Sequence, residues 1–167
     1  MSHRIELYKS LGAPGSLAYA ALRTMLELGK NSAESAVAHA AALGIQGFHV
    51  LGDPILQVPI SLDAQLVPIR WEANIEIAAH RHPRLYPHFS GTLSITPTGT
   101  DHSELWLIGD YVPPLGVVGD IVDRTLFRDV AEGSLNDFVA RLATHIEAQV
   151  QKTQHEHERA IRAMHNG

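Results

Sequence analysis

Residues 109–150 read GDYVPPLGVVGDIVDRTLFRDVAEGSLNDFVARLATHIEAQV, and this stretch decides the fold. From Leu126 to Val150 the apolar residues recur at steps of mostly three, four or five, which is the spacing of one face of an α-helix. Asp120 is suited to cap this helix, because its carboxylate can accept hydrogen bonds from free amides of the first turn. The pattern predicts one long amphipathic helix from near Asp120 to Val150. An apolar stripe of this length must lie on a broad apolar surface.

The residues upstream supply such a surface, because their hydrophobic period is two. The clearest predicted strand covers residues 66–78, and residues 89–95 and 105–111 show the same alternation. This alternation indicates antiparallel strands with one buried and one solvated face. In the first of these strands the predicted inner residues are Val67, Ile69, Trp71, Ala73, Ile75 and Ile77.

The first part of the chain predicts a strand at residues 3–11 and helices at 16–28 and 31–43. Alternation from residue 45 to 62 adds further strands, and Pro59 favours an edge position there because proline cannot donate to a sheet ladder. We therefore expect an α+β fold in which a curved antiparallel sheet surrounds the long C-terminal helix, with two short helices after the first strand. Residues 1–150 form the single predicted domain. Residues 151–167 are a polar tail, expected to be frayed helix or disorder.

Composition narrows the function classes. A net charge of −5, with no basic cluster, argues against nucleic acid or an anionic membrane as partner. The absence of cysteine excludes disulfides, thiolate metal ligands and a cysteine nucleophile. The first ten residues, MSHRIELYKS, lack the apolar core of a signal peptide, and no apolar run is long enough to insert into a membrane. We expect a cytoplasmic protein.

The order of elements, with Pro113-Pro114-Leu115-Gly116 leading into the long helix, resembles the START/Bet v1-like (SRPBCC) superfamily and its helix-grip fold. The likeness is greatest to a bacterial, polyketide-cyclase-like branch. The residues that carry the resemblance are 67–73, 85–93, 109–111, 113–116, 123–124, 130–132 and 138–142. The resemblance implies a cavity for a small hydrophobic, aromatic or lipid-like molecule between the sheet and the long helix. The superfamily has no shared catalytic signature, so the resemblance assigns no reaction.

The predicted inner faces are almost entirely apolar or glycine, and Tyr111 is the one titratable residue assigned to them. This favours binding over catalysis, because a general acid or base must reach the substrate. Trp71 and Tyr111 would either stack on a flat ligand or fill core volume. In the alternative function, a polyketide cyclase or dehydratase, Tyr111 is the candidate proton donor. The candidate ligand-binding residues are Ile69, Trp71, Ala73, Ile75, Phe89, Leu93, Leu107, Tyr111, Leu115, Phe127, Val130 and Leu135.

Two further groups of residues invite other interpretations. His80, His82 and His88 are close in sequence, but a zinc site needs three or four converging ligands and no carboxylate is near them in sequence. We therefore expect solvated histidines, no metal and no cofactor. Trp106 and Ile108 are apolar residues on the predicted outer face. They would lie under the early helices or against a partner, so a homodimer or a protein-interaction module is a third possibility.

Overall fold

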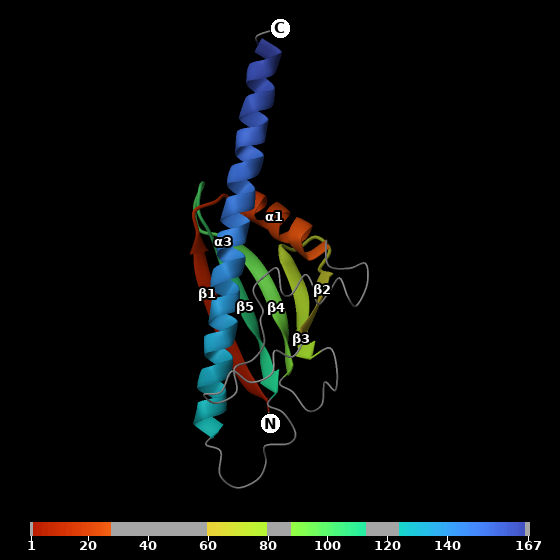
Figure 1. Cartoon of the computed structure of the whole chain (residues 1–167), viewed down its shortest axis with the longest axis vertical. Helices are drawn as coiled ribbons and strands as arrows, with labels where there is room; N and C mark the ends of the chain where they lie inside the picture. The colour runs from red at the N-terminus through yellow and green to blue at the C-terminus, as the bar shows by residue number, and fades with distance from the viewer. Residues whose placement is uncertain (1, 28–59, 80–87, 113–123, 166–167) are drawn as a thin grey trace.

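The computed structural model describes residues 2–27, 60–79, 88–112 and 124–165 (Figure 1). Side chains are described for these residues except 60, 61, 79 and 124–131. The elements are β1 (His3–Leu11), α1 (Gly15–Glu27), β2 (Ile60–Leu66), β3 (Glu72–Ala79), β4 (His88–Pro97), β5 (Ser103–Val112) and α3 (Arg124–His165). The predicted helix at 31–43, Pro59 and Asp120 lie outside the described residues.

The strands form one antiparallel sheet in the order β1-β5-β4-β3-β2. The first strand therefore pairs with the last one, and β2 and β1 are the edges of the described sheet. α3 crosses one face of this sheet and α1 lies beside it on the same side (Figure 1). The expected α+β architecture, an antiparallel sheet covered by a long C-terminal helix, is confirmed.

The core lies between the sheet and the two helices. Alternate residues of the central strands point toward α3, as their period of two requires. The buried stripe of α3 opposes them. Its members are Leu135, Phe138, Val139, Leu142, Ala143, Ile146 and Val150.

The turn between β1 and α1 is hydrogen-bonded both to α3 and to the sheet. The Gly12 backbone N–H donates to Glu147 Oε1 of α3 at 2.7 Å. The buried Ser103 hydroxyl, at the start of β5, donates to the Ala13 carbonyl oxygen at 2.9 Å. These two bonds connect the turn to α3 on one side and to β5 on the other.

The prediction of one continuous strand over residues 66–78 is wrong. β2 ends at Leu66 and β3 begins at Glu72, so residues 67–71 form the turn of a hairpin. The Val67 N–H donates to the Glu72 carbonyl at 3.0 Å and closes this turn. Ile69 has a φ of 66°, in the left-handed region that a β-branched residue rarely adopts. A regular strand does not contain that conformation, so the strand ends at this turn although apolar residues continue to alternate in the sequence.

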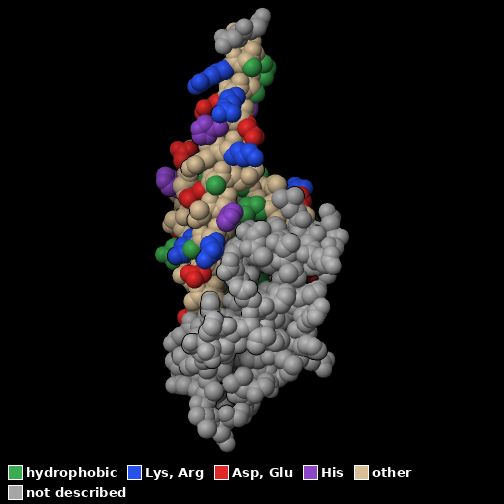
Figure 2. All heavy atoms as spheres, in the orientation of Figure 1, with side chains coloured by type: hydrophobic (Ala, Val, Ile, Leu, Met, Phe, Trp, Pro, Cys, Tyr) green, Lys and Arg blue, Asp and Glu red, His purple; other side chains and the backbone are tan. Residues whose placement is uncertain are grey.

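The prediction for the tail is also corrected. α3 is continuous to His165, well beyond residue 150. Every side chain from residue 151 to 165 is exposed, and this part of the helix projects beyond the sheet (Figures 1 and 2). The helix therefore has a packed part, which ends at Val150, and a projecting part, which touches nothing else in the described chain.

Candidate functional site

The inner face of the sheet carries one row of large side chains across its strands. Paired residues in this row are Leu62 and Ile77, Ile77 and Phe89, and Phe89 and Tyr111. All four are buried, and Phe89 is completely inaccessible. Paired residues of an antiparallel sheet point to the same face, so Phe89 and Tyr111 both point to the inner side of the sheet.

Two glycines make room for the aromatic row. Gly91 of β4 pairs with Gly109 of β5. A Cβ built on Gly91 would lie 2.8 Å from Cζ of Phe89, and one on Gly109 would lie 2.6 Å from the same atom. The Phe89 ring therefore covers the glycine pair and occupies the space that two side chains would need. Such an aromatic cover over strand glycines stabilises a strongly curved sheet.

Tyr111 is the ionisable residue that β2 to β5 contribute to this inner face. Among the described inward side chains of β2 to β5 no other group titrates. Burial raises the pKa of Tyr111 to about 12, because apolar surroundings disfavour the charged phenolate. At neutral pH the residue is a neutral phenol that can donate or accept a hydrogen bond.

Two titratable groups at the edge of the inner face were not predicted from the sequence. The register places His3 of β1 opposite Tyr111, and Lys9 opposite Leu105, so both belong to the inner side. Both are half-buried. The alternation of Ile5 and Leu7 was the signal that could have identified them, because His3 and Lys9 share that period.

The predicted ligand-binding residues divide into three groups. Seven are buried and gathered on the inner side; these are Ala73, Ile75, Phe89, Leu93, Leu107, Tyr111 and Leu135. Leu115 and the side chains of Phe127 and Val130 lie outside the described residues. Ile69 and Trp71 are not part of the strands that form the inner face, because both belong to the turn between β2 and β3.

The surroundings of these two residues explain the error. Ile69 is fully exposed at the tip of the turn. Trp71 stacks on Tyr19 of α1, with ring centroids 6.3 Å apart, and 38% of its surface remains exposed. A Cβ on Gly15 would lie 2.8 Å from Cζ3 of Trp71, so the indole packs closely against the start of α1. Trp71 therefore joins the hairpin turn to α1 at the end of the sheet that carries Ile95, remote from Phe89 and Tyr111.

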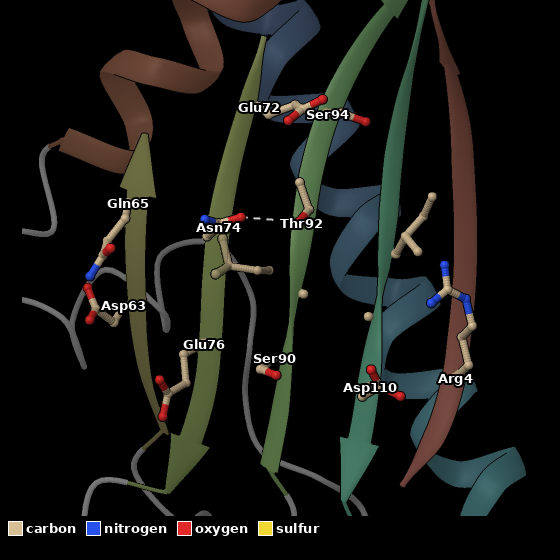
Figure 3. A pocket seen from close by; sticks show the side chains of 14 residues that line it. Arg4, Asp63, Gln65, Glu72, Asn74, Glu76, Ser90, Thr92, Ser94 and Asp110 are labelled. Carbon is tan, nitrogen blue, oxygen red and sulfur yellow. Dashed lines mark hydrogen bonds between the residues drawn. The ribbon is translucent and has the colours of Figure 1, made fainter. Parts of the chain in front are cut away.

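The outer face of the sheet carries a polar trough of about 700 Å³ (Figure 3). Its floor follows β4, where the outward side chains of Ser90, Thr92 and Ser94 are small. Longer side chains of the neighbouring strands form the walls, so the hollow results from a difference in side-chain size between strands. The wall residues are Glu72, Asn74 and Glu76 of β3, Ile108 and Asp110 of β5, Asp63 and Gln65 of β2, and Arg4 of β1.

Two polar contacts cross between β3 and β4 on this face. Thr92 Oγ1 donates to Asn74 Oδ1 at 3.2 Å. His88 Nε2 lies 3.0 Å from Glu76 Oε1. His80 and His82 are outside the described residues, and the described ones contain no group of three metal-ligating side chains. His88 therefore has a carboxylate neighbour that sequence distance did not reveal.

The outward aromatic residue Trp106 is partly covered by the side chain of Tyr8 on the neighbouring strand, a contact that was not predicted from the sequence. The Tyr8 ring of β1 stacks on it, with ring centroids 4.9 Å apart. Its indole N–H donates to Glu104 Oε2 at 3.0 Å. Both Trp106 and Ile108 are half-buried on the outer side, as the alternation predicted.

The same arrangement of sheet and helix occurs in solved structures. The Zhui aromatase/cyclase from Streptomyces sp. R1128 is 15% identical over 91% of this chain and 95% of its own, with a TM-score of 0.54. The chain has the helix-grip fold of the START/Bet v1-like (SRPBCC) superfamily. Norcoclaurine synthase from Thalictrum flavum shares this fold at 13% identity, covering 90% of this chain and 87% of its own, with a TM-score of 0.56. The protein Ara h 8.0201 matches at 10% identity, covering 91% and 99%, with a TM-score of 0.51.

These likenesses establish the helix-grip fold and no reaction, since each is below one quarter identity. No family model matches the sequence, and no curated protein matches it. Within the described part of the helix-grip domain, no helix is both long and apolar enough to cross a membrane.

Proposed function

We propose that this protein binds a small hydrophobic molecule, aromatic or lipid-like, between the inner face of the sheet and α3. The observation that carries the proposal is the row of Phe89 and Tyr111 on an inner face that is otherwise mostly apolar, with His3 and Lys9 at its β1 edge. Ligand sites in proteins are typically apolar with a few polar groups that orient the ligand. A buried neutral phenol is such a group.

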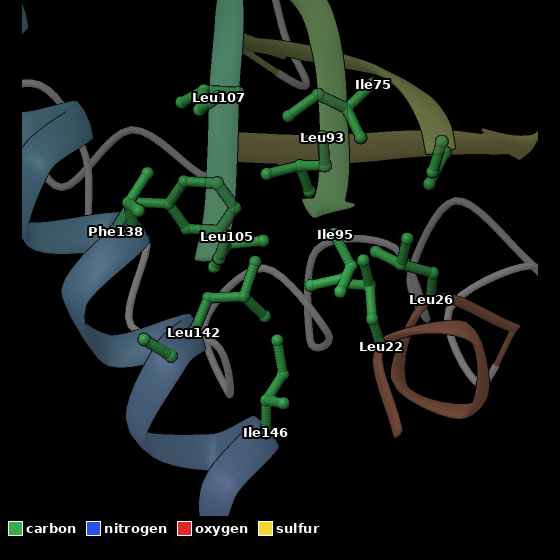
Figure 4. Packing of buried hydrophobic residues seen from close by; sticks show 14 of the residues in the cluster. Leu22, Leu26, Ile75, Leu93, Ile95, Leu105, Leu107, Phe138, Leu142 and Ile146 are labelled. Atoms are coloured by element: carbon green, nitrogen blue, oxygen red, sulfur yellow. The ribbon is translucent and has the colours of Figure 1, made fainter. Parts of the chain in front are cut away.

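The packing favours one end of the inner face for this ligand. Leu142 and Ile146 of α3, with Leu22 and Leu26 of α1, converge over Ile95 and Leu105 (Figure 4). Side chains from the sheet, α3 and α1 therefore fill that end of the core. The row that contains Phe89 and Tyr111 lies at the opposite end of β4 and β5, away from α1, and we place the ligand there.

Solved relatives of the fold support a ligand of this class. One structure of norcoclaurine synthase, with a TM-score of 0.52 to this chain, is in complex with dopamine and hydroxybenzaldehyde. Another solved structure of this fold is named an aromatase/cyclase. These are properties of those proteins, and they motivate the aromatic class of ligand tested below.

Uptake of a hydrophobic fluorophore tests the proposal with a matched pair of variants. Ile77 is buried in the row, opposite Phe89, whereas Glu76, the residue before it, points outward and is exposed. We expect wild-type protein to bind the fluorophore, Ile77→Phe to bind it several-fold more weakly because the larger ring fills space beside the row, and Glu76→Phe to bind it like wild type. Native mass spectrometry of the protein as isolated would report a retained molecule. No fluorophore uptake and no retained molecule would contradict the proposal.

The alternative is a cyclase or dehydratase that uses Tyr111 as its acid. The observation in its favour is that Tyr111 and His3 are opposite each other on the inner register. A phenol with a pKa of about 12 is poorly matched to proton transfer at neutral pH, so we prefer binding. Tyr111→Phe distinguishes the two functions: a binding protein should keep most of its affinity for the fluorophore, and an enzyme should lose turnover.

A further inference from the structure

The projecting part of α3 carries a basic stripe. Lys152, His155, Arg159 and Arg162 follow each other at steps of three, four and three, which places them on one face of a helix. At 100° per residue this face lies roughly 160° from Ile146, the centre of the buried stripe. The basic stripe therefore points away from its own sheet. Figure 2 shows Lys and Arg side chains spaced along the projecting helix with acidic side chains between them, and Glu156 and Glu158 are the acidic residues of this part of the sequence.

The trough on the outer face of the sheet has the opposite charge. Its lining includes four carboxylates, those of Asp63, Glu72, Glu76 and Asp110, and one guanidinium, that of Arg4. The carboxylates point into the same hollow from three strands (Figure 3). Glu72 has Arg70 at 3.6 Å as an exposed neighbour, and Glu76 has His88 at 3.0 Å. Exposed pairs of this kind are weak and exchange readily, so the trough remains a surface suited to a basic partner.

The projecting helix cannot reach the trough of its own molecule. α3 is one continuous helix, its packed part lies on the inner face, and the trough lies on the outer face. The helix would have to break and turn around the edge of the sheet. A helix with this stripe can reach a trough of this kind only when a second copy of the chain supplies one of them.

The two surfaces match in size. From Lys152 to Arg162 the stripe spans ten steps of 1.5 Å, about 15 Å in all. The floor from Ser90 to Ser94 spans four steps of 3.4 Å, about 14 Å. The walls on β3 and β5 are two strand spacings apart, about 10 Å, and a helix with side chains is about 10–12 Å wide.

We propose that the projecting helix of one copy lies along the outer trough of a second copy, with Arg159 and Arg162 against the carboxylates of β3. This contact would also stabilise the projecting helix, because an isolated helix of fifteen residues is marginal in water. Reciprocal insertion by two copies would close a two-fold dimer, the commonest symmetry of soluble oligomers. In the alternative contact, the projecting helices of two copies would pair with each other. Few apolar side chains are available for that pairing, because Ile161 and Met164 are the only large ones between residues 151 and 165.

Sedimentation velocity of the full chain tests the proposal by charge reversal. We expect association at 0.1 M salt that weakens at 1 M salt, because salt screens exposed charges. Arg159→Glu with Arg162→Glu in the helix, or Glu72→Lys with Glu76→Lys in the trough, should each weaken association about tenfold or more. A mixture of the two double variants should recover it. Arg23→Glu with Arg141→Glu changes the net charge equally outside both surfaces and should leave association unchanged.

Two results would overturn the proposal. A wild-type chain that stays monomeric at several hundred micromolar overturns the proposal. Association that survives both reversals also overturns it, and loss of association in Ile161→Ser with Met164→Ser would then assign the contact to paired helices. All four reversed positions are exposed or partly exposed, and far-UV circular dichroism would show that each variant keeps its fold.

Discussion

The two faces of the sheet are made by the same strands, but they differ in burial and in polarity. On β4, Leu93 is completely buried beneath the helices, whereas Thr92 beside it points into the polar trough. On β5, Leu107 is buried and Ile108 is half-buried on the outer side. The inner face holds the domain together by excluding water, and the outer face is free to carry charge. Substitutions should therefore have very different costs on the two faces.

The largest effect should come from a charge placed on the helix that covers the inner face. Leu135 of α3 is 2% exposed, so Leu135→Asp buries a carboxylate among apolar side chains. The cost is several kcal/mol, comparable to the stability of a whole domain. We expect loss of the cooperative thermal transition, followed by circular dichroism. Asn136→Asp, on the exposed neighbour, should melt near the wild-type temperature; equal behaviour of the two variants would show that the packed half of α3 is wrongly placed.

The next comparison tests the two faces at adjacent residues. Leu93→Ala should destabilise the protein by about 2–5 kcal/mol, because it removes buried apolar volume and leaves a cavity. Thr92→Ala removes one exposed hydrogen bond, to Asn74 at 3.2 Å, and should change the stability by less than about 0.5 kcal/mol. Urea unfolding measures both. Similar costs at the two positions would mean that β4 does not alternate as described.

A third comparison uses two glycines with opposite surroundings. A methyl group on Gly109 would overlap the Ser90 carbonyl oxygen and meet the Phe89 ring, so Gly109→Ala should cost about 1–3 kcal/mol. Among the described residues, nothing beyond the adjoining backbone of α3 lies within 4 Å of a Cβ added to Gly133. Gly133→Ala should therefore stabilise the helix by about 0.5–1 kcal/mol. Midpoints of urea unfolding decide this, and a tolerated Gly109→Ala would contradict the close contact between β4 and β5.

The smallest effect concerns the pH dependence of stability at Tyr111. Its pKa is about 12 in the folded protein and near 10 for an ordinary tyrosine. The folded state therefore holds its proton when the unfolded state has lost it, and stability should fall as pH rises from 10 to 12. Tyr111→Phe should remove about 1–2 kcal/mol of that fall. Unfolding at pH 9 and pH 11 measures it, with the exposed Tyr8→Phe as control; equal slopes in both variants would show that Tyr111 is not desolvated.

Much of the fold was predictable because its signals are local. The alternation in β4 and β5 identified Leu93, Leu107 and Tyr111 as inward, and all three are buried. The hairpin turn was missed because Ile69 and Trp71 continue the apolar alternation through it. Pro68 was the signal against a strand, since proline lacks the N–H that a central ladder needs. For the candidate site, the burial of the inner residues followed from the pattern, while binding by them stays a prediction.

The sequence by itself determined which face of each strand is apolar and which stripe of the last helix is buried. Side-chain direction repeats every two residues in a strand and every 3.6 in a helix, so this information is present in each segment alone. The tertiary structure decided that Phe89 covers Gly91 and Gly109, that small residues of β4 lie between longer ones to form a trough, and that α3 continues past the sheet. These features depend on which segments become neighbours, and no pattern within one segment specifies its neighbours.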